Sequence, residues 1–489
     1  MKKKNEIYDL IEFEQKYNLI NRKLLNMNYW DFCRSTFFYE IKTLKNNINH
    51  VINVNKKINS KDRKLLIKNL KNYFFFKHEN IDLLFIADPR RIKNKNTYLQ
   101  PFVDEIIEKI SQEYSSMIIE EPNWKAWNYG LPAHLTPEKT NNIKYTDLYE
   151  NVFLFKRKLI EIFKKNEIKL IYGEFEYLKK IINEYFKIDI SKKEKEFIDL
   201  ILYFKYMKNP YKKILKSINP KIVILNYRPT YFKNLITIIC NELSIPTIEL
   251  QHGIISNEDP IDKVNPNQKD FKTRAKYLFT FGERLVSKEL LPFKKNEIKN
   301  IGYPHLENKK NKKYPLPEIM DKEHKYILII SQSIIGDNIA NFAASLSRIL
   351  ENNKKYKIIY KYHPNELEKD YTQLKKDNII EIKNMNYDLF HLQKFSYCQI
   401  GSYSTGLYEG IILGLPTIII KNILGSEATI NNLKDFEKGI YITDSTDNIA
   451  DLLDNLESPS KKDINKLWKN DSTNNFKKEI QKIIKSSIK

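Results

Sequence analysis

The feature that most constrains the fold is a series of short apolar runs that alternate with helical periodicity along 489 residues. Runs of this length suit strands that are buried on both faces of a sheet. Strand, loop, helix and strand in this order is typical of a parallel sheet with crossover helices. The sequence therefore predicts an α/β fold with parallel sheets. We expect strands at residues 81–87, 116–120, 222–225, 246–250, 326–330, 357–360, 379–382 and 397–400.

The length exceeds that of one ordinary hydrophobic core and predicts two domains of roughly 200 residues each. A lysine-rich linker at residues 309–313, followed by Pro315 and Pro317, marks the boundary between them. We expect a first Rossmann-like α/β domain at residues 77–308, to which a helical N-terminal segment at residues 1–76 also belongs. The second α/β domain is expected at residues 309–458, and a basic amphipathic helix at residues 459–489.

The formal charge of +22, from 83 Lys and Arg against 61 Asp and Glu, favours anionic partners such as nucleotides, acidic glycans or lipid headgroups. A lysine-biased solvated surface explains the same charge without any partner. Three distant cysteines without CxxC spacing exclude a disulfide framework and a thiolate zinc site. The start of the sequence has no apolar signal region, and no stretch of 18 apolar residues occurs. We expect a cytoplasmic protein, soluble or peripheral at the membrane.

Two histidines follow expected strands, at the sheet edge where ligands of open α/β proteins bind. His252 lies in Gln251-His252-Gly253, and a histidine there could remove a proton from a sugar hydroxyl. His363 lies in Tyr362-His363-Pro364 and could donate a hydrogen bond to a phosphate as the leaving group departs. Each histidine also has a purely structural interpretation, at a domain interface for His252 and as a turn cap for His363.

The stretch from Gly401 to Gly410 is typical of a strand end, a small-residue turn and a helix start. Unpaired N–H groups and the helix macrodipole favour an anion at such a start. Ser402, Ser404 and Thr405 are therefore donor-binding candidates, although all three also suit helix capping. Glu409 favours the donor-binding interpretation over simple capping, because an unpaired carboxylate in a sheet–helix region is unfavourable unless a ribose diol or a basic partner is nearby.

Weaker candidates also follow strand ends. Ser331 and Gln332 could bind phosphate or cap a helix. Three arginines could hold an anionic acceptor or lie on a solvated surface: Arg90, Arg91 and Arg228. Three carboxylates could replace His252 as the base: Asp88, Glu120 and Glu121.

Several catalytic motifs are missing from the sequence. We find no P-loop, no Rossmann Gly-x-Gly-x-x-Gly, no Gly-x-Ser-x-Gly elbow and no His-Glu-x-x-His. No Asp-x-Asp closes an apolar strand, so a metal-chelated diphosphate is not indicated. We therefore expect neither a metal nor a cofactor.

Four motifs occur in an order that resembles bacterial GT-B glycosyltransferases of capsule and surface-polysaccharide assembly. The resemblance covers roughly residues 215–425 and extends to Kdo-type capsule transferases and teichoic-acid CDP-glycerol glycerophosphotransferases. It implies two facing Rossmann-like domains, with acceptor on the first, nucleotide donor mainly on the second, and no divalent metal. The four motifs are Gln251-His252-Gly253, Gly302-Tyr303-Pro304, Tyr362-His363-Pro364 and the run from Ser402 to Glu409.

The resemblance also implies roles for individual residues. His252 matches the proposed catalytic base, and His363 matches the histidine near the donor phosphate. Ser404 and Thr405 match the phosphate-binding helix start, Glu409 matches the nucleotide contact, and Tyr303 joins the donor-binding candidates. Gln251 stands where the glycerophosphotransferases favour Trp, which argues against that particular substrate.

These observations predict a glycosyltransferase that moves a sugar from a CMP-, CDP- or UDP-linked donor to a growing surface glycan or lipid-linked acceptor. The alternatives are a UDP-sugar 2-epimerase, a CDP-glycerol-type polyol-phosphate transferase and a non-catalytic polyanion binder. Nucleic acid is not an expected partner, because the aromatic residues lie within apolar runs instead of an exposed basic stripe.

The C-terminal segment has two interpretations. Phe476, Ile480, Ile483, Ile484 and Ile488 recur at helical spacing among lysines. Such a helix could lie on the inner face of the membrane, where lipid-linked acceptors reside. It could equally close the first domain by packing on it.

Overall fold

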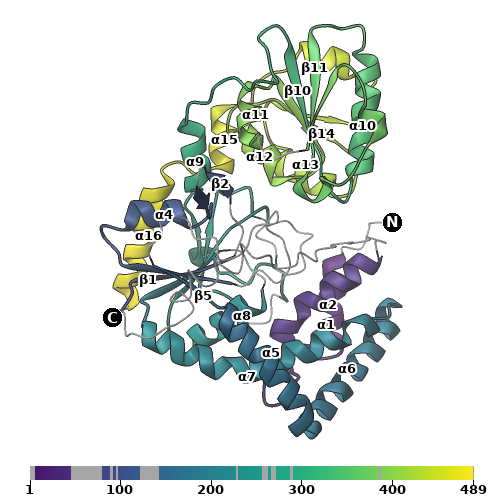
Figure 1. Ribbon diagram of the computed structural model, residues 1–489. Coiled ribbons are helices and arrows are strands. Elements are labelled where there is room, and N and C mark those ends of the chain that lie inside the picture. Colours follow the sequence, from purple (N-terminus) through teal and green to yellow (C-terminus); the bar gives the residue numbers. More distant parts are fainter. Residues whose placement is uncertain are drawn as a thin grey trace, which may run out of the picture. The chain divides into compact units, whose positions relative to one another are not determined.

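The computed structural model describes residues 6–45, 80–88, 92–94, 97–121, 142–226, 230–255, 263–265, 271–286, 290–383 and 387–487. The chain folds into two compact units, which are considered one at a time (Figure 1). Unit 1 comprises Met1–Thr280, Ser287–Lys299 and Thr473–Lys489, and unit 2 comprises Phe281–Val286 and Asn300–Ser472.

Unit 1 is built on a sheet with strand order β5-β4-β1-β6-β7-β8-β9. From β5 to β8 every pairing is parallel. The central strands β1 and β6 are buried along their whole length, as expected of strands covered on both faces. The strands are β1 (Leu83–Ala87), β4 (Ser116–Glu120), β5 (Ile143–Tyr145), β6 (Ile222–Asn226), β7 (Thr247–Leu250), β8 (Tyr277–Thr280) and β9 (Ile298–Asn300). A separate antiparallel hairpin joins β2 (Ile92–Asn94) to β3 (Thr97–Leu99).

Helices of unit 1 bury a core that is rich in aromatic rings. Trp30 stacks on Phe37 at 5.7 Å between ring centroids, and the fully buried Glu14 carboxylate is paired with Arg34 at 2.7 Å. The α-helices are α1 (Glu6–Lys16), α2 (Trp30–Lys45), α4 (Asp104–Ile110), α5 (Asp147–Phe163), α6 (Lys165–Phe186), α7 (Glu194–Ile218), α8 (Tyr231–Glu242) and α16 (Ser472–Ser487). Short 3₁₀ turns occur at η1 (Leu19–Asn21), η3 (Ser191–Lys193) and η4 (Lys295–Glu297).

Unit 2 is built on a second sheet, with strand order β12-β11-β10-β13-β14-β15 and parallel pairing throughout. Its strands are β10 (Lys325–Ile330), β11 (Tyr356–Lys361), β12 (Ile379–Ile382), β13 (Cys398–Gly401), β14 (Thr417–Ile420) and β15 (Ile440–Thr443). Its α-helices are α9 (Pro304–Asn311), α10 (Gly336–Ile349), α11 (Leu389–Phe395), α12 (Thr405–Ile411), α13 (Ser426–Leu433), α14 (Ile449–Asp454) and α15 (Lys461–Leu467), with 3₁₀ turns η5 (Pro364–Glu366) and η6 (Thr372–Leu374).

Both sheets are parallel α/β sheets with crossover helices, so the predicted class of two Rossmann-like domains is confirmed. Each sheet has one point where the chain reverses its direction of strand addition, between β1 and β6 in unit 1 and between β10 and β13 in unit 2. In open α/β sheets, ligands bind outside the carboxyl ends of the strands at such a switch point. The topology therefore directs attention to the residues that follow these four strands.

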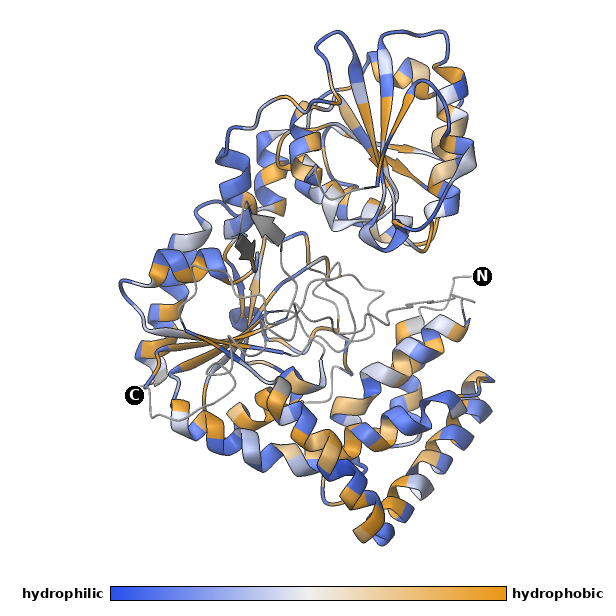
Figure 2. Cartoon of the chain, viewed as in Figure 1, coloured by the Kyte–Doolittle hydropathy of each residue, from blue (hydrophilic) through white to orange (hydrophobic). Residues whose placement is uncertain are grey.

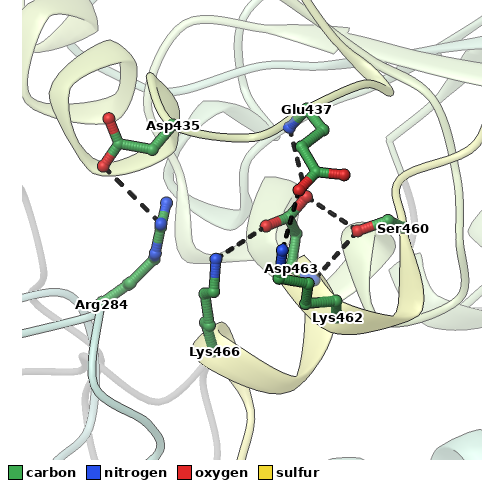
Figure 3. A network of polar contacts seen from close by, with 7 residues as sticks. All are labelled: Arg284, Asp435, Glu437, Ser460, Lys462, Asp463 and Lys466. Atoms are coloured by element: carbon green, nitrogen blue, oxygen red, sulfur yellow. Dashed lines mark hydrogen bonds and ion pairs between the residues drawn. The ribbon is translucent and has the colours of Figure 1, made fainter.

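Helix α15 is tied into unit 2 by a network around Asp463, whose side chain is fully buried (Figure 3). The Asp463 carboxylate accepts hydrogen bonds from the Ser460 hydroxyl at 2.8 Å, the Glu437 backbone N–H at 3.2 Å and the Lys466 ammonium at 3.2 Å. Burial works against the charge, but these donors outweigh it and hold the pKa of Asp463 below its usual value. Arg284 reaches Asp435 in the same region at 3.6 Å, so the network joins the two segments of unit 2.

The C-terminal helix α16 packs on unit 1. Phe476, Ile480 and Ile483 are buried, and the Phe476 ring meets Phe279 of β8 edge-on at 5.8 Å between centroids. Lys477 and Lys299 pair with carboxylates on neighbouring parts of the same unit. Of the two interpretations of this helix, the structure supports the packing one. Within the described residues, no helix combines the length and the apolar character needed to span a bilayer.

Candidate functional site

In unit 2, three residues predicted to bind the donor follow adjacent parallel strands. Ser331 follows β10, His363 follows β11 by one residue, and Ser402 follows β13. Because these strands are neighbours in the sheet, the three residues lie along one edge, at the switch point. The sequence therefore predicted correctly that these three residues follow strands that are neighbours in one sheet. The three side chains nevertheless make different contacts.

Ser331 is buried, and its hydroxyl is already engaged within the protein. It donates to Glu366 Oε1 at 3.0 Å and accepts from the Tyr360 hydroxyl at 2.9 Å. Tyr371 donates to the same Glu366 oxygen at 2.9 Å. This geometry makes Ser331 a support for the turn after β11. Gln332, next in sequence, is half-buried and begins the turn into α10, where its carbonyl accepts from Ile335 N–H.

His363 combines a capping role with an open donor. The ring Nδ1 of His363 accepts the Asn365 backbone N–H at 3.2 Å, and the His363 backbone N–H donates to Glu366 Oε2 at 2.9 Å. Burial lowers the pKa of His363 to about 4, so the ring is neutral near pH 7. Since Nδ1 is the acceptor, the proton resides on Nε2, which makes no hydrogen bond to any described residue. A neutral N–H donor therefore stands at this edge, and it can bind a phosphate oxygen without carrying charge.

The predicted helix start at Thr405 is confirmed. Some residues around it allow close packing of the helix, and others carry polar side chains that cap it or lack a partner. The Ser404 hydroxyl accepts from Gly406 N–H at 3.1 Å and caps α12, which is the structural role the sequence left open. A Cβ at Gly406 would come within 2.5 Å of Leu389, and one at Gly410 within 2.3 Å of the Gln399 amide. Both glycines thus allow close packing of α12. Ser402 differs, because its buried hydroxyl has no hydrogen-bond partner among the described residues.

Glu409 is the most unusual ionisable group of unit 2. It lies on α12, is half-buried, and makes no hydrogen bond or ion pair with a described residue. Desolvation raises its pKa to about 7, Lys309 lowers it, and Asp388 raises it further. Lys309 does not neutralise Glu409, because its ammonium is paired with Asp388 at 2.6 Å. A carboxylate without a donor is thus held beside a closed ion pair.

Two functional candidates of this region were not predicted from the sequence. Lys361 ends β11, and burial lowers its pKa to about 8 while the charge of Asp388 opposes the shift. Tyr360 and Tyr362 point to the opposite face of the strand and are buried in the core, so Lys361 faces the α11 side. Strand alternation could have indicated this position. Asp388 caps α11 through Phe390 N–H, and nothing in the linear sequence connects it with Lys309 or Glu409.

The Gly-Tyr-Pro motif forms the start of α9, the helix that carries Lys309. Gly302 has φ +95°, and a Cβ there would meet the Lys469 carbonyl at 2.2 Å. Tyr303 stacks on Phe281 at 4.6 Å between centroids, and Phe281 stacks in turn on Trp468 at 5.3 Å. Tyr303 therefore anchors this helix, and through it the position of Lys309. Its predicted donor contact remains a prediction.

In unit 1, the predicted base His252 follows β7 at the carboxyl edge of the sheet and is half-buried. The buried Gln251 side chain donates to the Gly253 carbonyl at 2.7 Å and closes the turn around His252. The Gln251 backbone N–H donates to Phe279 of β8 at 2.9 Å. Gln251 thus fixes the backbone of His252. It is the residue at which the chain departs from the glycerophosphotransferase pattern.

A second polar cluster lies at the switch point of unit 1. Asp88 after β1 and Asn226 at the end of β6 are bonded across it, with Asp88 N–H donating to Asn226 Oδ1 at 2.9 Å. Beside them, Glu121 accepts from Thr230 at 2.9 Å and pairs with Lys233 at 3.0 Å, and the Lys233 side chain is wholly buried. Burial raises the pKa of Glu121, although Lys233 lowers it. Lys233 was not predicted, because the apolar residues around it in helix α8 do not indicate that its side chain points into the protein.

The three arginines proposed for the acceptor, Arg90, Arg91 and Arg228, lie outside the described residues. Glu120 ends β4 and is buried. Within the described ranges, no group of three or more His, Cys, Asp or Glu is placed to hold a metal ion.

No family model matches the chain, and no curated protein matches it. Among solved structures, it is similar to the UDP-GlcNAc 2-epimerase from Methanocaldococcus jannaschii, with a TM-score of 0.49 and 12% identity, over 82% of this chain and 99% of that one. It is also similar to the glycotransferase of kitacinnamycin, with a TM-score of 0.47 and 8% identity over 84% and 96% of the two chains. A third similar structure is the wall teichoic acid polymerase TagF, with a TM-score of 0.45 and 14% identity over 93% and 98%. Values this low assign neither substrate nor reaction, so the functional argument rests on the chain's own residues.

Proposed function

We propose that this protein is a metal-independent glycosyltransferase that moves a sugar from a nucleotide-activated donor to a surface glycan. The observation that carries the proposal is the edge of the unit 2 sheet. It gathers a neutral histidine N–H and a lysine with a lowered pKa, together with a buried serine hydroxyl and a carboxylate that have no hydrogen-bond partner among the described residues. Buried polar groups that the fold leaves unsatisfied are expected at ligand sites.

In this proposal the nucleotide donor binds unit 2. His363 Nε2–H donates to a phosphate oxygen, and Lys361 supplies a positive charge close to it. The ribose hydroxyls donate to Glu409, which supplies the partners that this carboxylate lacks. As the bond between the sugar and the phosphate breaks, the leaving nucleotide takes the electron pair and is stabilised by these same groups.

The acceptor is proposed to bind unit 1, where His252 removes the proton from the attacking hydroxyl as it attacks the anomeric carbon. Glu121 is the second candidate for this base, because burial raises its pKa and so makes the carboxylate a better proton acceptor. The Glu121–Lys233 pair makes this less favourable than His252, since it holds the carboxylate in an ion pair. The capsular acceptor, the CMP, CDP or UDP donor, and a location at the inner face of the plasma membrane belong to this proposal.

The experiment has two stages. A thermal-shift screen with CMP, CDP, UDP and GDP identifies the nucleotide, and absence of stabilisation by every one of them contradicts the proposal. The donor sugar of that nucleotide is then incubated with and without acceptor glycan, and the products are identified by mass spectrometry. A transferase forms a lengthened glycan and releases nucleotide. Epimerised donor without acceptor would instead establish the epimerase alternative, and transfer of a polyol phosphate would establish the glycerophosphotransferase alternative.

A further inference from the structure

Helix α5 of unit 1 carries two apolar stripes, and one of them faces solvent. Phe153 and Ile160 pack into the unit 1 core. On another face, apolar side chains recur every three or four residues and are exposed, which places them along one line of the helix. Figure 2 shows hydrophobic segments along this helix. The exposed residues on this line are Leu148, Val152, Phe155, Leu159 and Ile162, and Leu154 is exposed away from it.

Further exposed apolar residues follow at the end of α5 and on α6. Phe163, the last residue of α5, is 75% exposed, Phe155 is 65% exposed, and Leu170 on the first turns of α6 is 59% exposed. Single exposed hydrophobic residues need no explanation, but a contiguous apolar surface of this kind marks an interaction site. We call the exposed residues of α5 together with Phe163 and Leu170 the α5 surface.

Lysines border the α5 surface, and two of the nearby acids are held in ion pairs. Lys156, Lys158, Lys164, Lys165 and Lys169 make no ion pair with a described residue. Glu161 pairs with Arg157 at 3.0 Å, and Glu167 pairs with Lys205 at 2.7 Å. The surface therefore presents an apolar strip with unneutralised positive charge at its margins.

This charge pattern distinguishes between two occupants. The exposed stripe has the spacing of a coiled-coil seam, so a second copy of the chain is the competing partner. In such a pairing the residues that flank the seam normally alternate in sign between the two helices. Here Lys156 and Lys158 flank the stripe on its two sides, and no acid on either flank of α5 would face them in a second copy. Two copies would therefore bring these lysines into the seam region without acids to pair with them.

We propose that the α5 surface binds an anionic lipid surface. Apolar side chains enter the boundary between headgroups and acyl chains, while the flanking lysines reach the lipid phosphates. The C-terminal helix, for which the sequence left a membrane role open, has its apolar face buried in unit 1. This inference does not depend on the proposed reaction.

The test is sedimentation of the full-length protein with vesicles of phosphatidylcholine alone or mixed with phosphatidylglycerol. Wild-type protein should sediment with the anionic vesicles, and 0.5 M NaCl should weaken the binding about tenfold or more, because screened lysines lose their attraction. The double variant Phe155→Gln with Phe163→Gln should bind at least about tenfold more weakly, since two phenylalanine side chains no longer enter the lipid. The matched control, Leu424→Gln with Ile442→Gln, removes two exposed apolar residues of unit 2 and should bind as wild type.

Because all four residues are exposed, the variants should melt at the wild-type temperature, which separates lost binding from lost folding. Absence of wild-type binding to anionic vesicles would overturn the proposal, as would equal binding by the Phe155/Phe163 variant. Light scattering of the same proteins tests the competing partner. A dimer that the Phe155/Phe163 variant dissociates, with vesicle binding unchanged, would assign the α5 surface to a second copy.

Discussion

Glu409 gives the sharpest prediction, because its environment opposes its own charge. Its pKa rises from an ordinary value of 4.5 to about 7. A carboxyl group with a raised pKa in the folded state adds no penalty below its unfolded pKa. As the pH rises from 4.5 through 7, the folded state ionises less readily than the unfolded state, so stability is lost and the full penalty is present above pH 7.

The magnitude follows from the size of the shift. At about 1.4 kcal/mol for each pKa unit, the penalty at pH 8 is at most about 3.5 kcal/mol, and partial exposure of Glu409 reduces it to about 1 to 3 kcal/mol. The variant Glu409→Gln removes the charge and keeps the shape. We expect it to be more stable than wild type by this amount at pH 8 and unchanged at pH 4.5. Lys309 is not left unpaired by the change, because Asp388 remains its partner.

The assay is urea unfolding of both proteins at pH 4.5, 6 and 8, together with nucleotide binding at pH 8. The control is Glu318→Gln, an exposed glutamate of unit 2 whose removal should change stability by less than about 0.5 kcal/mol. Glu409→Gln should also weaken binding of the nucleotide found in the thermal-shift screen by about tenfold or more, because a charged acceptor of two hydroxyl donors is lost. A variant that is less stable than wild type at pH 8, or that binds nucleotide unchanged, would refute the reasoning.

Three further predictions concern the other candidate groups. His252→Ala should reduce transfer at least about 100-fold while the thermal shift caused by nucleotide stays as in wild type, and equal loss of both would make His252 structural. His363→Asn keeps a capping acceptor but removes the Nε2–H donor, so it should lose nucleotide affinity and keep wild-type stability. His363→Ala should lose both nucleotide affinity and stability. Retained affinity in the Asn variant would remove His363 from the donor site. Lys233→Met leaves the Glu121 carboxylate buried without its partner and should destabilise by about 3 to 5 kcal/mol in chemical unfolding, while the double variant with Glu121→Gln should recover much of this loss; equal destabilisation of the two proteins would show that the pair is not coupled.

The sequence predicted the central strands well, because a strand buried on both faces is a continuous apolar run. Strands β5 and β15 are among those that escaped prediction, for the opposite reason. They lie at the two sheet edges, and β5 is the short Ile143-Lys144-Tyr145, which carries no continuous apolar signal. The helix start at Thr405 was predicted from small residues followed by an apolar run.

The site was predicted less completely than the fold. Strand ends fixed the places of His252, His363 and Ser402, since topology alone brings those ends to one edge of each sheet. The residues that surround these positions could not be predicted from the sequence. Lys309 and Asp388, for example, lie 79 residues apart and meet only through the packing of α9 and α11. Ser331, which the sequence left open between phosphate binding and capping, supports the turn after β11, and its donor contact stays a prediction.

The central claim is that a nucleotide donor binds at the switch point of the unit 2 sheet. Hydrogen–deuterium exchange of the full chain, with and without a saturating concentration of the stabilising nucleotide, tests it most directly. The account predicts slower exchange in peptides that cover residues 331–336, 361–366 and 401–409. Protection confined to unit 1, or none at saturation, would contradict it.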